Sequence, residues 1–127
     1  LVFLMLSLSL IAEVINQPLD KNLVNSSIPI VDIRTPGEWK ETGIIKGSIP
    51  IMFFDERGNY DVRGFLQELN NKVDTQKKFA LICRSGSRTG MVSAFLSQKL
   101  GYSVINLVGG INTTLDKKYL LEPYKGH

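Results

Sequence analysis

Short apolar runs alternate with longer segments of helical periodicity along most of this chain. Runs of β-branched and large apolar residues predict strands at 28–33, 79–82 and 104–108, and the first two are continuous enough to be buried on both faces. A fourth apolar run surrounds Pro50, within 48–53. Strand-like and helix-like segments in alternation are the pattern of an α/β domain.

The helix signals lie between these runs. Thr35 is a predicted N-cap, with Pro36 at the first helical position and Glu38 completing a capping box, and Gly43 ends this short helix. Apolar residues recur at spacings of three and four from 61 to 73 and from 88 to 100, which predicts two amphipathic helices. After a turn at Gly109, the remaining residues are predicted to form a helix that ends near Pro123.

The first twelve residues form an uncharged apolar run that stops before Glu13. Its length is typical of the core of a signal peptide and too short for a stable membrane span. We favour a truncated export signal, which would place the protein in the periplasm or outside the cell. The alternative is an N-terminal helix, which would leave the protein in the cytoplasm. Residues 13–127 are then one domain.

Composition and charge argue against several classes of function. The 127 residues are 43% hydrophobic and 21% charged, which suits one compact domain. The net charge of +3 is spread along the chain, so we expect no nucleic-acid partner. A single cysteine, Cys83, and a single histidine, the terminal His127, argue against a disulfide framework, a metal site and a Cys-His catalytic pair. We expect no cofactor.

The segment from Cys83 to Arg88, Cys-Arg-Ser-Gly-Ser-Arg, carries the clearest chemical signal. It links a predicted strand to a predicted helix, and its small residues allow backbone N–H groups to converge at the positive end of the helix dipole. Such a loop holds an anion. We therefore expect Cys83 to be partly or largely thiolate at neutral pH without help from a histidine.

A lone cysteine after an apolar strand is by default a packing residue. Two arginines within five residues of Cys83, and a glycine between serines ahead of a helix, are not needed for packing. They favour a reactive thiol in an electropositive, partly open environment.

Several sequence blocks together resemble the rhodanese domain. They occur in the expected order from residue 28 to residue 111: Val31 to Arg34, Glu38-Trp39, Gly43 to Pro50, Cys83 to Arg88, Gly101-Tyr102 and Leu107 to Ile111. The sequence departs from the family pattern at Ile44, where a histidine is frequent, and after Gly109-Gly110, where a tryptophan is common. Both positions concern packing and loop support more than chemistry.

The resemblance implies an α/β fold with an open, mainly parallel five-stranded sheet and helices on both faces. It implies that Cys83 carries sulfur as a persulfide. The resemblance implies that the persulfide is held by the backbone amides of the next five residues, Arg84, Ser85, Gly86, Ser87 and Arg88. It also implies that the side chains of Arg84 and Arg88 attract an anionic donor such as thiosulfate.

Three further polar residues are expected to support the site instead of reacting. Asp32 and Arg34 follow or end a buried strand, where polar side chains usually bind neighbouring loops. Thr89 is expected to close the loop through a local backbone hydrogen bond.

The predicted function is a sulfurtransferase that moves sulfur from a small anionic donor to cyanide or to a small or protein thiol. A cysteine phosphatase or arsenate reductase is the first alternative, although those enzymes place five residues between cysteine and arginine and here four intervene. A non-catalytic rhodanese-like binding module is the second. A thiol redox protein would need a second cysteine.

Overall fold

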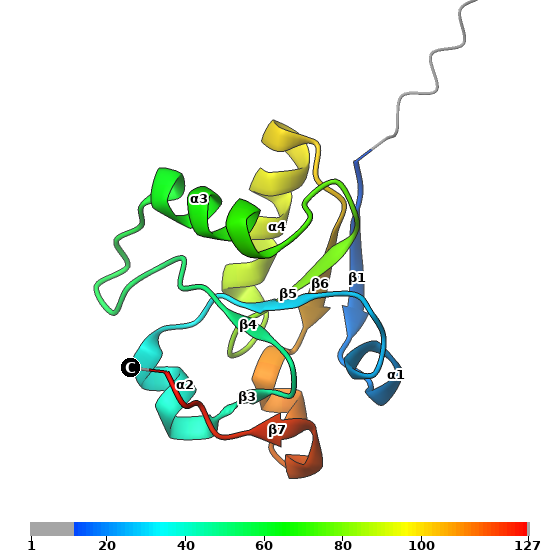
Figure 1. Ribbon diagram of the computed structural model, residues 1–127, viewed down its shortest axis with the longest axis vertical. Helices are drawn as coiled ribbons and strands as arrows, with labels where there is room; N and C mark the ends of the chain where they lie inside the picture. Colours follow the sequence, from blue (N-terminus) through cyan, green and yellow to red (C-terminus); the bar gives the residue numbers. More distant parts are fainter. Residues whose placement is uncertain (1–11, 127) are drawn as a thin grey trace, which may run out of the picture.

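The structure is a computed structural model that describes residues 12–126. The predicted signal or helix at 1–12 falls, except for Ala12, outside the described residues. Five parallel strands form the central sheet in the order β1-β6-β5-β2-β4 (Figure 1), which confirms the predicted fold class. Their bounds are β1 Val14–Pro18, β2 Ile30–Asp32, β4 Ile49–Pro50, β5 Phe79–Ile82 and β6 Val104–Val108.

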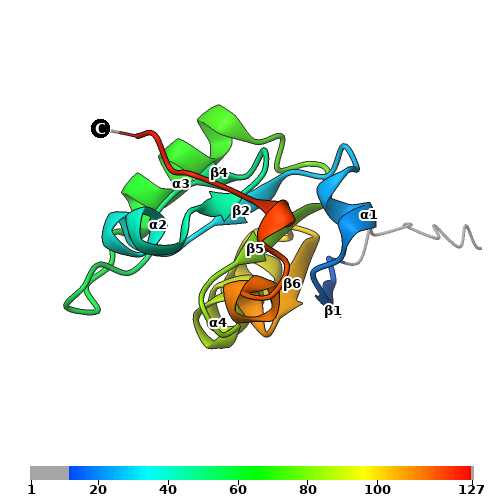
Figure 2. The same ribbon diagram turned by 90° about the horizontal axis from the view of Figure 1, so that it is seen from below.

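In the described part of the chain, four α-helices and two 3-10 helices connect the strands. The α-helices are α1 Lys21–Val24, α2 Pro36–Thr42, α3 Val62–Lys72 and α4 Ser87–Leu100, and the 3-10 helices are η1 Gly110–Thr114 and η2 Lys118–Leu120. A second, antiparallel pair joins β3 Ile44–Ile45 to β7 Leu121–Glu122. This pair returns the C-terminal segment to α2 (Figures 1 and 2). There the ring centroids of Tyr124 and Trp39 are 5.2 Å apart.

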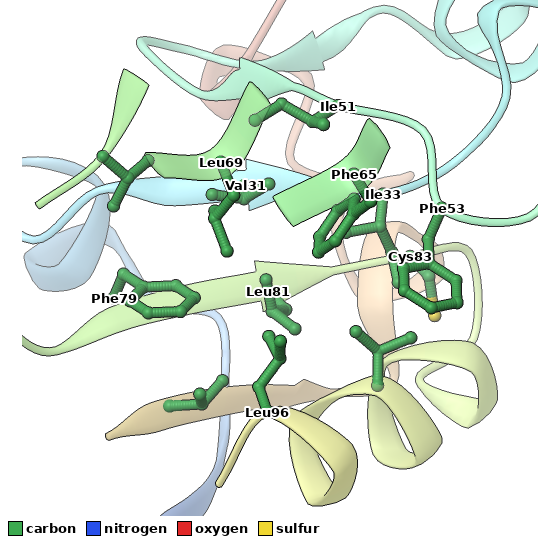
Figure 3. Close-up of a cluster of buried hydrophobic side chains, with 13 residues drawn as sticks. Val31, Ile33, Ile51, Phe53, Phe65, Leu69, Phe79, Leu81, Cys83 and Leu96 are labelled. Carbon is green, nitrogen blue, oxygen red and sulfur yellow. The ribbon is translucent and has the colours of Figure 1, made fainter. Parts of the chain in front are cut away.

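The sheet is apolar on both faces because its central strands carry apolar residues at nearly every position, and alternate residues point in opposite directions. On one face, Leu81 and Val31 pack with Phe65 and Leu69 of α3 and Leu96 of α4 (Figure 3). The other face is covered by α1, η1 and η2, whose buried contributions are Leu23, Ile111 and Leu120. Helices therefore lie on both faces, as the sequence pattern implied.

The predicted start and end of α2 are confirmed. The Thr35 side chain accepts a hydrogen bond from the Glu38 N–H, and the Glu38 side chain accepts one from the Thr35 N–H. Gly43 ends the helix with φ of +79°, a conformation that favours glycine. A Cβ there would lie 2.5 Å from the Glu122 carbonyl oxygen, so this glycine also permits β7 to approach.

Two expectations need correction. The first strand of the sheet is β1, which the sequence pattern did not reveal because polar residues interrupt it and only β6 pairs with it. The predicted C-terminal helix is wrong: η1, η2 and β7 occupy this segment. The segment is divided into short pieces and ends in β7, which pairs with the distant strand β3, so its course depends on a long-range contact.

Within residues 12–126, the structure contains no helix with the length and apolar character needed to cross a membrane.

Candidate active site

Cys83 directly follows β5, the middle strand of the sheet, and only three residues separate it from the start of α4 at Ser87. The Gly86 N–H donates a hydrogen bond to Cys83 Sγ at 3.1 Å. Gly86 has φ of +99°, and a Cβ at this position would come within 2.9 Å of the Gly109 nitrogen. The thiol is buried, at one end of the apolar cluster between the sheet and the helices α3 and α4 (Figure 3).

The turn after β6, which begins with Gly109 and Gly110, holds the backbone of the cysteine loop in place. The N–H groups of Ile111 and Asn112 donate to the carbonyl oxygens of Cys83 and Arg84, at 2.8 and 3.0 Å. Gly110, with φ of +55°, allows this approach, because a Cβ there would clash with both carbonyl oxygens. The two loops form one unit, and this explains the Gly-Gly pair at 109–110.

Thr89, in the first turn of α4, links the thiol to two distant asparagines. Its Oγ1 lies 3.6 Å from Cys83 Sγ and donates to Asn106 Oδ1 at 2.6 Å or to the Gly86 carbonyl at 3.1 Å. Asn106, on β6, donates in turn to Asn16 Oδ1 on β1 at 3.0 Å. A polar chain therefore runs from the sulfur across two strands to the sheet edge. Because Thr89 is fully buried, its position is well defined by these partners.

The two loop arginines are paired with acidic residues of α2. Arg88 forms a bidentate pair with Glu38, with nitrogen to oxygen distances of 2.8 and 2.9 Å. Arg84 donates from Nε to Glu38 at 3.1 Å and from Nη2 to Glu41 at 3.2 Å. Glu38 thus joins both arginines to the N-terminal turn of α2, in addition to its role in the capping box.

These contacts set the protonation of the cluster. Hydrogen bonds from Arg88, together with its charge and a hydrogen bond from Arg84, lower the pKa of Glu38 from 4.5 to about 2, against the opposing effect of burial. The same hydrogen bonds raise the pKa of both guanidinium groups. Glu38 is therefore a carboxylate at every pH at which the loop would work.

Asp32 and Arg34 form a separate, fully buried ion pair of 2.8 Å. The remaining donors of Arg34 bind Thr42 Oγ1 at 2.8 Å and the Gly43 carbonyl at 2.9 Å. The pair thereby attaches the end of α2 to β2, and none of its hydrogen bonds reaches the thiol. This position agrees with a supporting function.

The structure places the loop residues Cys83 to Arg88 and Thr89 around the thiol and leaves Asp32 and Arg34 in their separate pair. It also adds partners that sequence reasoning did not assign to the site. Ser85 and Ser87 lie on the open side of the loop, with their hydroxyl oxygens 3.3 Å apart. The added residues are Glu38, Asn106 and Asn16. A polar Asn106 inside an otherwise apolar strand was the one available signal, because buried polar residues require partners. The substrate roles of the loop arginines remain predictions.

In chemical terms, the site presents one thiol at the N-terminus of a 14-residue helix, with a backbone donor on the sulfur and a hydroxyl beside it. The sulfur therefore has two polar partners at the edge of an otherwise apolar cluster. The whole chain has no second cysteine that could resolve a mixed disulfide internally. The arrangement suits a nucleophile that accepts an atom or group and passes it on.

Comparisons with known proteins agree with this geometry. The sequence model of the family Rhodanese-like domain matches residues 12–116. A rhodanese-like domain protein from Staphylococcus aureus superposes with a TM-score of 0.63 at 23% identity, covering 89% of this chain and 99% of that one. A Rhodopseudomonas palustris protein of unknown function, described as a possible tyrosine phosphatase, superposes with a TM-score of 0.51 at 28% identity, covering 76% and 72%.

Among curated proteins, an uncharacterized protein of Rickettsia prowazekii, RP600, is 32% identical over 83 residues, which make up 63% of this chain and 65% of that protein. The chain thus spans just under two thirds of this relative's length. The match to the family covers the sheet, the cysteine loop and the turn beneath it. The chain belongs to the family of rhodanese-like domains.

Proposed function

We propose that this protein is a sulfurtransferase in which Cys83 accepts sulfane sulfur from an anionic donor and passes it to cyanide or a thiol. The observation that carries the proposal is the position of the thiol in a loop that ends in a helix N-terminus, with the Gly86 N–H donated to Sγ. A persulfide on Cys83 is an anion that this loop can hold.

The reaction has two half-reactions. The Cys83 thiolate attacks the sulfane sulfur of the donor, a sulfur–sulfur bond forms, and the rest of the donor leaves with the bonding electron pair; for thiosulfate the leaving group is sulfite. A thiophilic acceptor then attacks the outer sulfur of the persulfide, and Cys83 leaves as a thiolate. Sulfur is transferred without net oxidation, so no external oxidant or reductant is needed.

Steady-state kinetics test the proposal. With a sulfane donor and cyanide varied together, the protein should form thiocyanate with the parallel double-reciprocal lines of a ping-pong mechanism. Cys83→Ser, which keeps the shape of the residue but removes the sulfur, should form none. Thiocyanate formation by both proteins at equal rates would refute the role of Cys83.

The similarity to a possible tyrosine phosphatase supports a second candidate, because phosphatases of this kind also use a thiolate in an anion-binding loop. Four residues separate Cys83 from Arg88, so the loop is shorter than the phosphatase loop and fits one sulfur atom better than a phosphoryl group. Hydrolysis of aryl phosphates that disappears in Cys83→Ser, without thiocyanate formation, would favour the phosphatase. If the protein shows neither activity, a non-catalytic binding module is favoured.

A further inference from the structure

We infer that the sulfur donor is a singly charged organic sulfane compound, of the thiosulfonate or organic persulfide class, and that Glu38 discriminates against doubly charged thiosulfate. The inference rests on the proposed sulfurtransferase function and specifies its substrate class. It rests on two observations: the charge balance of the arginines beside Cys83, and the lining of the groove next to them.

The arginines do not give the site a net positive charge. Glu38 accepts hydrogen bonds from both Arg84 and Arg88, and Glu41 accepts a further one from Arg84. Two guanidinium groups therefore face two carboxylates. The bidentate pair with Arg88 uses the fork of donors that would otherwise bind a sulfonate or sulfate group. A small dianion has to compete with a carboxylate that is only 17% exposed and already fully hydrogen-bonded to both arginines.

A groove of about 600 Å³ borders this cluster and shares Glu38 and Arg88 with it. Its lining adds the acidic residues Asp55 and Glu56, so that three carboxylates oppose one guanidinium. The same groove contains the ring of Phe54 and the side chain of Met91, a large apolar residue that is 61% exposed. An acidic, partly apolar groove repels a dianion and accommodates an organic group.

The chemistry of the inferred donor is balanced. The Cys83 thiolate attacks the outer sulfur of R–SO₂–S⁻, a Cys83 sulfur–sulfur bond forms, the bond between the two donor sulfurs breaks, and the sulfinate R–SO₂⁻ leaves with the electron pair. One thiolate and one thiosulfonate give one persulfide anion and one sulfinate, so charge is conserved. The organic group R would lie against Phe54 and Met91.

Glu38→Gln is the variant that tests the inference. Glutamine keeps one carbonyl oxygen for the capping box of α2. Its NH2 group takes the place of the oxygen that accepts from Arg84 Nε and Arg88 Nη2, so the negative charge and these two hydrogen bonds are lost. The Coulomb energy between Glu38 and the donor is proportional to the donor charge. The fold-change in kcat/KM on removing the Glu38 charge is therefore, for a dianionic donor, the square of the fold-change for a monoanionic one. We expect Glu38→Gln to raise kcat/KM about tenfold for thiosulfate and about threefold for benzenethiosulfonate, and we expect both increases to shrink at high salt.

Met91→Gln tests the apolar part of the groove. It should lower kcat/KM for benzenethiosulfonate about threefold, leave methanethiosulfonate within twofold and leave thiosulfate unchanged. Glu13→Gln is the matched charge control, since Glu13 is an exposed carboxylate beside the amino end of β1, whereas Cys83 follows the carboxyl end of a parallel strand. Glu13→Gln should leave kcat/KM unchanged for both donors.

The outcomes separate the inference from the proposed function. If persulfide forms but Glu38→Gln changes both donors by the same factor, Glu38 is a structural residue and the inference is overturned. If Glu38→Gln does not fold, Glu41→Gln, which removes a more exposed carboxylate of the same cluster, must shift the two donors in the same unequal way, and an equal shift overturns the inference. If no donor loads Cys83 in the wild type, the proposed function itself fails.

Discussion

At the level of single residues, Cys83 depends on side chains that are far from it in the sequence. Thr89 lies six residues away, but its partner Asn106 belongs to another strand and Asn16 to a third. Each of these polar groups forms a hydrogen bond with the next one in a buried or partly buried environment. Removing one member should therefore affect both the stability of the protein and the reactivity of the thiol.

Thr89→Val should lower the free energy of unfolding by about 1–3 kcal/mol, because the buried Asn106 Oδ1 loses its donor. Sulfur transfer should slow as the hydroxyl beside the sulfur is lost. Thr89→Ser, which keeps the hydroxyl, should retain most of both properties. Urea unfolding and thiocyanate formation measure the two effects, and equal results for valine and serine would show that the hydroxyl has no role.

Glu38 should make stability depend on pH in the acid range. Its pKa is about 2 in the folded protein against 4.5 ordinarily, so the stabilisation is fully present above about pH 4.5 and is lost as the pH falls towards 2. Glu38→Gln should lower the free energy of unfolding by about 2 kcal/mol at pH 7, allowing for partial solvent screening. The difference between wild type and variant should vanish near pH 2. A difference that stays constant from pH 7 to pH 2 would contradict the account.

The sequence allowed Cys83 and its loop to be predicted because the relevant residues are contiguous, and local spacing shows where a strand gives way to a helix. The capping role of Glu38 was predictable for the same reason. Its ion pairs with Arg84 and Arg88 were not, because they join positions 46 and 50 residues apart. The hydrogen bond between Asn106 and Asn16 could not be predicted either, since it depends on which strands are neighbours in the sheet.

At the level of elements, the cysteine loop and the turn at 109–110 are mutually dependent. Gly110→Ala should displace the carbonyl groups of Cys83 and Arg84, because a Cβ has no space there and φ is positive. We expect a loss of activity of more than tenfold and destabilisation by more than 1 kcal/mol, the usual effect of the backbone strain alone.

Gly47→Ala is the matched control for this prediction. Gly47 also has a positive φ, of +75°, but no atom lies within 4 Å of the Cβ position. It should lose about 1 kcal/mol of stability and keep its activity. Comparable losses of activity in the two variants, measured by thiocyanate formation, would show that close packing under the cysteine loop is not required.

Elements with strong local signals were predicted well. The helices α2, α3 and α4 and the strands β5 and β6 follow from caps and apolar periodicity. The edge strand β1 and the C-terminal segment were not, for a shared physical reason: both are determined by long-range pairing. β1 pairs with β6 about 90 residues later, and β7 pairs with β3, so neither had to carry a strong pattern of its own.

At the level of the whole molecule, the parallel sheet explains why the reactive thiol lies where it does. In open α/β sheets, ligands bind at the carboxyl ends of the strands, and Cys83 follows the carboxyl end of the middle strand. The helices α3 and α4 bury one face of the sheet, and α1, η1 and η2 bury the other. The loop is thus attached to a buried scaffold, and the arginine cluster beside it borders the groove.

The most direct test of the central claim is the mass of the intact protein after incubation with a sulfane donor and then with cyanide. We predict that the wild type gains about 32 Da, one sulfur atom, that cyanide removes this mass, and that Cys83→Ala never gains it. A wild type that keeps its original mass with thiosulfate and with thiosulfonate, or a Cys83→Ala variant that gains the same mass, would contradict the persulfide mechanism.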